Sequence, residues 1–107
     1  MLFVERFEID TSKGWTEVTL LKKCEMQKVT QVAAILTEKL NIHFTTKMND
    51  MDSLYWDFIY EGAELCMHYN IYVGISLLPL RFEQAKEWEN EAVVKLARDI
   101  GSTELLL

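Results

Sequence analysis

The chain has 107 residues and a formal net charge of −6 at neutral pH, and half of its residues are hydrophobic. This length fits one domain, and the apolar fraction is sufficient for a core that needs neither a metal ion nor disulfides. The acidic balance argues against nucleic-acid binding, which requires clustered lysine and arginine. We therefore expect a single domain spanning residues 1–107.

The charges near the N-terminus and the two cysteines bear on the location of the protein. Residues 5–10 carry charges where a signal peptide would need an apolar stretch, and no apolar run approaches the ~18 residues of a membrane span. Cys24 and Cys66 are far apart in the chain, and a secreted disulfide scaffold would carry more cysteines. These features predict a soluble cytoplasmic protein that does not contact a membrane.

The N-terminal half contains several segments with strand character. Residues 2–9 favour a strand, and the polar residues that follow favour a turn. Residues 15–21 alternate and could form a second strand, but they could also form the first turns of the helix that follows. Residues 42–48 alternate strictly, which predicts a half-buried strand.

Two helices are predicted from apolar residues that recur at three- and four-residue steps. The first spans residues 25–40, and Asn41 is expected to end it. The second spans about residues 82–100, and Gly101 lies where a C-terminal cap is expected. The apolar stripes of the two helices are Met26, Val29, Val32, Ala33, Leu36 and Leu40, and Phe82, Ala85, Trp88, Ala92, Val93, Leu96 and Ile100.

Residues 55–80 read as three antiparallel strands. Gly62 is expected to open a two-residue type II′ turn between the first two strands, which pairs Phe58 with Met67 and Asp57 with His68. A three-residue loop at 70–72 then keeps apolar residues opposite one another in the second hairpin. The remaining pairs expected from these two turns are Tyr60 with Leu65, Trp56 with Tyr69, Tyr69 with Val73, Met67 with Ile75, Leu65 with Leu77, and His68 with Gly74.

The fold class that follows is α+β: an antiparallel sheet of about 4–6 strands with both helices packed on one face. The other face is then open to water, as antiparallel sheets allow. Residues 41–80 hold one basic and five acidic side chains, so this face is expected to be acidic. Its expected members are Tyr55, Asp57, Glu61, Glu64, Cys66, His68, Asn70 and Ser76, with Tyr72 in the adjoining loop.

Asp57 and His68 form the best candidate for a chemical site. A carboxylate opposite an imidazole would raise the histidine pKa and orient the ring for general-base catalysis, with Cys66 nearby. The competing interpretation is a cross-strand surface pair without catalytic role. Cys66 and His68 could also supply two metal ligands, with His43 or Asp57 as others. With only two cysteines and two histidines in the chain, we expect no metal and no cofactor.

The small, acidic, α+β profile without a catalytic motif is similar to that of many bacterial accessory and toxin-neutralising immunity proteins; the likeness is one of type and rests on no motif. We expect a protein-interaction module whose partner is a basic protein or a second copy of the chain. A small enzyme or ligand-binding domain built on Asp57, His68 and Cys66 is the alternative, and a purely structural homodimer is a third hypothesis. The expected binding residues are Tyr55, Asp57, Glu61, Glu64, His68 and Tyr72.

Overall fold

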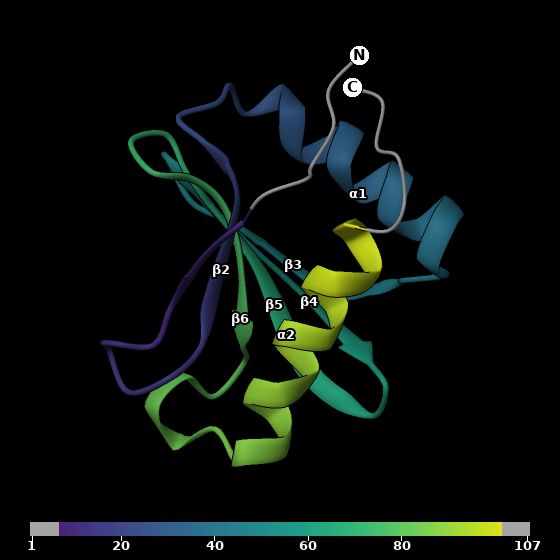
Figure 1. Ribbon diagram of the computed structural model, residues 1–107. Coiled ribbons are helices and arrows are strands. Elements are labelled where there is room, and N and C mark those ends of the chain that lie inside the picture. Colours follow the sequence, from purple (N-terminus) through teal and green to yellow (C-terminus); the bar gives the residue numbers. More distant parts are fainter. Residues whose placement is uncertain (1–6, 102–107) are drawn as a thin grey trace.

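A computed structural model describes residues 7–101 of the chain (Figure 1). One antiparallel sheet has the strand order β1-β2-β6-β5-β4-β3. Two α-helices complete the fold, which confirms the predicted α+β class. The elements are β1 Glu8–Asp10, β2 Glu17–Lys22, α1 Gln27–Leu40, β3 Phe44–Asn49, β4 Ser53–Tyr60, β5 Ala63–Asn70, β6 Gly74–Pro79, the short 3-10 helix η1 Phe82–Gln84, and α2 Glu87–Gly101.

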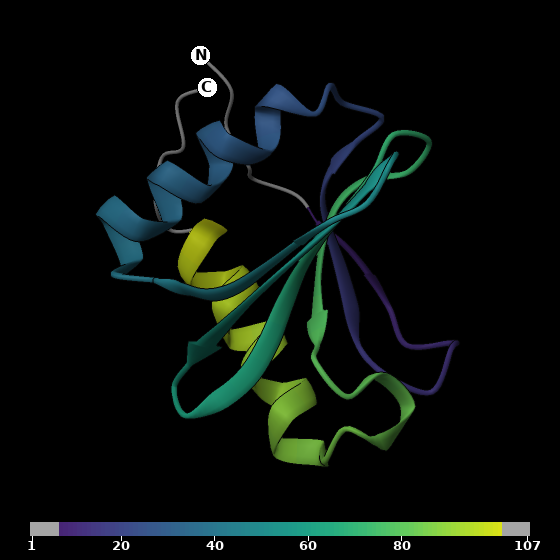
Figure 2. The same ribbon diagram turned by 180° about the vertical axis from the view of Figure 1, so that it is seen from behind.

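Both helices lie on the same side of the sheet, as predicted (Figures 1 and 2). A single apolar core joins the buried residues of α1 and α2 to those of the strands. Between residues 7 and 101, neither helix combines the length and the apolar character that a membrane span requires. The strand residues with less than 2% exposure in this core are Val18, Phe58, Ala63, Leu65, Met67, Tyr69, Ile75 and Leu77.

The structure decides between the two interpretations of residues 15–21. These residues contribute to β2, which pairs with β1 on one side and β6 on the other, so the strand reading is confirmed. Of the N-terminal strand expected at residues 2–9, β1 includes Glu8 and Ile9, while residues 2–6 lie outside the described part of the chain.

Strand β3 departs from the strict alternation predicted for residues 42–48. Its pairing with β4 shifts register between Phe44 and Thr46, so a bulge interrupts the strand. Beyond the bulge, Lys47 lies with its Nζ 4.4 Å from the ring centre of Trp56, and Asn49 accepts a hydrogen bond from the Trp56 indole at 2.9 Å. Two polar side chains therefore cover an edge of the core where the pattern predicts apolar ones.

Helix α1 ends where the sequence predicts. Asn41 adopts the left-handed conformation with φ 56°, and its N–H donates to the carbonyl of Thr37 at 3.1 Å. The buried stripe consists of Val29, Val32, Ala33 and Leu36. Met26 precedes the helix and is exposed, so it does not belong to this stripe.

The second helix begins five residues later than predicted, at Glu87. Phe82 has φ 53°, which no continuous right-handed helix can include. The helix starts instead where the buried Glu89 carboxylate accepts the backbone N–H of Lys86 at 2.9 Å, which is one half of the capping-box arrangement found at helix N-termini. Trp88 is half-exposed, so its predicted place in the core is wrong. The buried stripe consists of Glu89, Ala92, Val93, Leu96, Ala97 and Ile100.

The β4–β5 hairpin differs from the predicted register by two residues. Glu61 and Gly62 form the turn, with φ 53° and 80°, as a type I′ turn requires. A shift of two residues leaves every side chain on its predicted face, so hydrophobic alternation cannot reveal it. The observed pairs are Leu54 with Tyr69, Tyr55 with His68, Trp56 with Met67, Asp57 with Cys66, Phe58 with Leu65, Ile59 with Glu64, and Tyr60 with Ala63.

The β5–β6 hairpin carries the same two-residue error. Its loop is residues 71–73, so Val73 is exposed in the loop and the predicted pairing of Val73 with Tyr69 is wrong. His68 pairs with Ser76 instead of Gly74. Gly74 pairs with Lys22 of β2, has φ 107°, and a side chain there would meet the carbonyl oxygen of Leu21 at 1.9 Å. The backbone of Leu21 and Lys23 therefore fills the space beside Gly74.

Candidate functional site

We call the side of the sheet opposite the helices the helix-free face. It carries the outward residues of β4, β5 and β6, because their neighbours in the strands point into the core. Four of the six predicted binding residues lie together on it. Its members are Glu17 of β2, Ser53, Tyr55, Asp57, Ile59, Glu64, Cys66, His68, Asn70, Ser76 and Leu78, with Met48 of β3 and Phe82 of η1 at its border.

The two other predicted binding residues, Tyr72 and Glu61, lie elsewhere. Tyr72 is in the loop between β5 and β6. Glu61 is at the β4–β5 turn, where its carboxylate lies 3.5 Å from the Lys95 ammonium of α2. Lys95 also contacts Asp99 at 3.0 Å, and Asp99 accepts a hydrogen bond from the Tyr60 hydroxyl. Burial, assisted by this bond, raises the pKa of Tyr60 to about 12. Glu61 thus belongs to a charged cluster that ties the hairpin to α2.

Cys66 and Asp57 lie directly opposite each other on the helix-free face. Burial raises the pKa of the Cys66 thiol to about 12, and the Asp57 carboxylate adds to this by its charge and by accepting a hydrogen bond from the thiol. The thiol is therefore protonated at neutral pH. A nucleophilic cysteine needs the opposite effect on its pKa, so this geometry does not activate Cys66.

His68 has a different environment from the one predicted. Its ring stacks on Tyr55, with ring centres 4.6 Å apart and planes at 24°. Burial lowers the pKa of His68, Glu17 opposes this effect, and Lys13 adds to it. The predicted Asp57–His68 pair and its raised histidine pKa are wrong, because the register places Asp57 opposite Cys66.

Two buried polar atoms of this face lack a hydrogen-bond partner among residues 7–101. They are Nε2 of His68 and Oγ of Ser76, which lie on paired residues of neighbouring strands. Ser76 is only 1% exposed. A buried polar atom without a partner costs about 1–3 kcal/mol of stability, so most such atoms in folded proteins are satisfied. Sequence patterns place both residues on this face but do not reveal this property.

Large apolar side chains also remain exposed here. Met48 is 62%, Ile59 56% and Phe82 42% exposed. A shallow pocket of about 230 Å³ lies between Met48 and Phe82, and its lining residues are Met48, Tyr55, Asp57, Cys66, Leu80 and Phe82. Tyr55, Asp57 and Cys66 belong to the predicted site, whereas the sequence does not predict Met48, Ile59 and Phe82 as site members. Alternation does place Ile59 outward, but Met48 was assigned to the buried side of its strand.

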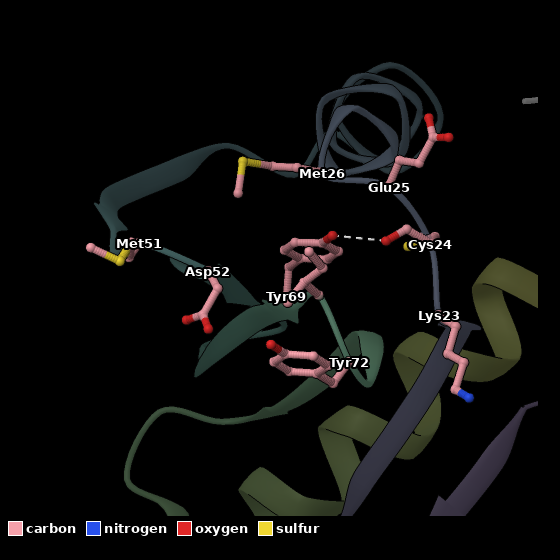
Figure 3. Close-up of a pocket in the computed structure, with 9 residues that line it drawn as sticks. Lys23, Cys24, Glu25, Met26, Met51, Asp52, Tyr69 and Tyr72 are labelled. Carbon is pink, nitrogen blue, oxygen red and sulfur yellow. Dashed lines mark hydrogen bonds between the residues drawn. The ribbon is translucent and has the colours of Figure 1, made fainter.

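A larger pocket of about 760 Å³, which we call the loop pocket, lies at one end of the sheet (Figure 3). Three connections form it: the segment after β2, the β3–β4 loop and the β5–β6 loop. Tyr69 closes its inner end and donates a hydrogen bond from its hydroxyl to the Cys24 carbonyl at 2.7 Å. The lining residues are Lys23, Cys24, Glu25, Met26, Met51, Asp52, Tyr69, Ile71 and Tyr72.

In the part of the chain from residue 7 to residue 101, no three His, Cys, Asp or Glu side chains are grouped so that they could hold one metal ion. Comparison with protein-family models, with curated proteins and with solved structures gave no significant match. The function must therefore be argued from the surfaces that the fold presents.

Proposed function

We propose that the protein is a protein-interaction module whose helix-free face binds a basic protein partner. The observation that carries this proposal is the exposure of Met48, Ile59 and Phe82 on one sheet face, although the fold has a complete core on the other. Clustered apolar side chains on a protein surface, surrounded by polar ones, are typical of binding sites.

The charges of the same face favour a basic partner. Two of its acidic side chains already have basic neighbours: Glu17 lies 3.5 Å from Lys13, and Glu64 lies 4.0 Å from Arg81. Asp57 forms no ion pair with any residue between 7 and 101. It lies in the lining of the shallow apolar pocket. A lysine or arginine of a partner placed over Asp57 would complete the pair and orient the encounter.

A second copy of the chain fits this face less well. In a symmetric dimer the same surface patch occurs on both subunits, so the Asp57 carboxylates of both copies would lie in one interface without a basic partner. Like charges brought together in an interface disfavour the complex. We therefore propose that a different protein, with a basic surface, binds this face. Self-association through this face would contradict the proposal.

The proposal can be tested by photocrosslinking in cells. A photoreactive amino acid replaces Ile59 in one variant and Glu91, an exposed residue of α2, in the control. We expect a crosslinked protein from position 59 that is absent from position 91. The captured protein is then produced alone, and its binding to the wild-type chain is measured at several salt concentrations.

The expected result is affinity that falls with added salt, and a loss of at least about tenfold on Ile59→Lys, as for a central contact. Asp57→Asn should slow association and reduce the salt dependence. Equal crosslinking from both positions, binding that Ile59→Lys leaves unchanged, or capture of a second copy of the chain would each overturn the proposal.

A further inference from the structure

We propose that the loop pocket binds a basic side chain of a peptide, with the cation between the Asp52 carboxylate and the ring of Tyr72. The helix-free face does not contribute to this pocket, and the inference does not rest on the function proposed for that face.

The three connections are joined to one another by backbone hydrogen bonds. Ile71 N–H donates to the Asp52 carbonyl at 3.2 Å, which links the β5–β6 loop to the β3–β4 loop. Lys23 N–H donates to the Val73 carbonyl at 3.2 Å, which links the β5–β6 loop to the segment after β2. The Tyr69 hydroxyl holds the same segment from inside. A pocket built in this way exists before its ligand arrives, which reduces the cost of binding.

The side chains around the pocket are large, apolar and exposed. Met51 is 94% and Tyr72 73% exposed, and Met26 and Ile71 are each about half-exposed. Methionine and tyrosine are enriched in binding surfaces because the first adapts its shape and the second offers a large, stiff ring. Their concentration at three connections that form one concavity indicates a binding site for a ligand with apolar parts.

Asp52 supplies the negative charge in the pocket that is available to a ligand. Its carboxylate forms no ion pair with any residue from 7 to 101. Figure 3 shows it pointing toward the hydroxyl end of Tyr72, while the charged ends of Lys23 and Glu25 point away from the two tyrosine rings. A cation that lies over the ring of Tyr72 and reaches the Asp52 carboxylate would be attracted by both the ring and the negative charge.

The size of the pocket favours a peptide over a free amine. A small cation would cover Asp52 and part of Tyr72 but leave Met26, Met51 and Ile71 in water. A lysine or arginine flanked by apolar residues would place its charge on Asp52 and its neighbours on these three side chains. The pocket volume of about 760 Å³ can accept more than one side chain.

The test uses a short synthetic peptide with one arginine between two leucines, and the same peptide with citrulline in place of arginine. Citrulline keeps the shape and removes the charge. Amide NMR spectra of the full chain are recorded with increasing amounts of each peptide and of free arginine amide. We expect shifts confined to the loop pocket, with the arginine peptide binding at least about fivefold more tightly than the citrulline peptide or arginine amide.

Four variants sharpen the result. Asp52→Asn and Tyr72→Leu should each weaken binding of the arginine peptide about fivefold. Tyr72→Phe, which keeps the ring, should leave the affinity unchanged. Asp57→Asn, on the helix-free face, is the matched control and should leave this affinity unchanged. The amide spectra show directly whether each variant is folded.

Equal binding of the arginine and citrulline peptides would overturn the inference, as would equal binding of arginine amide, no shifts at millimolar peptide, or shifts that map elsewhere. Loss of binding on Asp57→Asn but not on Asp52→Asn would assign the basic ligand to the helix-free face instead. Failure at the loop pocket would leave the partner proposed for that face intact, since that proposal is tested by crosslinking from position 59 and by the binding of the captured protein, not by peptide binding at the loop pocket.

Discussion

The two faces of the sheet are made from the same strands, but their side chains differ in how much they are exposed to water. In β4, Phe58 is 1% exposed while the next residue, Ile59, is 56% exposed. The difference arises because α1 and α2 both pack on the side of Phe58. On the other side, Leu78 of β6 is buried, whereas Ile59 of β4 and Met48 of β3 are exposed.

This comparison separates the residues that stabilise the fold from those available for binding. Side chains under the helices have their apolar surface removed from water by the chain itself, so their identity is explained by folding. Ile59, Met48 and Phe82 keep much of their apolar surface in water, and folding alone does not explain why they are large and apolar. The following predictions test this separation, beginning with the largest expected effect.

Neighbouring residues of β4 should differ strongly in their effect on stability. Phe58→Ala should lower the free energy of unfolding by about 3–5 kcal/mol, because it removes a buried ring and leaves a cavity. Ile59→Ala should change it by less than about 0.5 kcal/mol, as for other exposed positions. Urea denaturation of both variants measures the difference. Similar losses at the two positions would show that the helix-free face is covered in solution.

Replacing each of two buried serines of the helix-free face by alanine should change the stability of the protein in opposite directions. The Ser53 hydroxyl accepts a hydrogen bond from the Asn70 amide at 3.0 Å, so Ser53→Ala should cost about 1 kcal/mol. Ser76→Ala should instead raise stability by about 0.5–1 kcal/mol, because it removes a buried hydroxyl without a partner among the described residues. Thermal unfolding of the two variants provides the comparison. A loss at Ser76 equal to that at Ser53 would mean that the Ser76 hydroxyl is satisfied.

The smallest effect concerns His68 and pH. Its pKa in the folded protein lies below the ordinary value of 6.5, so the unfolded chain takes up more protons as the pH falls through that value. The contribution of neutral His68 is therefore fully present above pH 6.5 and is lost as the pH falls toward the folded pKa. Between about pH 7.5 and 5.5, stability should fall more in the wild type than in His68→Gln. Equal slopes in the two proteins would contradict the buried, neutral state.

Several features of the fold were predictable because they depend on local chemistry. The apolar stripe of α1, the left-handed Asn41 and the alternation of β4 and β5 follow from helical and strand periods. The same alternation places Tyr55, Asp57, Glu64 and His68 on one face, which the structure confirms. It also places Ile59 there, although the predicted site did not include it.

Other features depend on choices that the alternation pattern does not distinguish. Glu61–Gly62 and Gly62–Ala63 are both plausible two-residue turns, and they differ by two residues in the register of the hairpin. Both registers pair apolar residues on the core face, so the pattern cannot select one. The choice nevertheless decides whether Asp57 faces His68 or Cys66, and with it the sign of the shift in the pKa of His68.

The sequence by itself determined the fold class, the faces of the central strands and the C-terminal end of α1, because each depends on residues a few positions apart. Only the tertiary structure decided which residues meet across strands and loops. The loop pocket joins residues 23–26, 51–52, 69 and 71–72. The helix-free face joins β3, β4, β5, β6 and η1. Such contacts depend on strand order and register, to which periodicity within a single segment is insensitive.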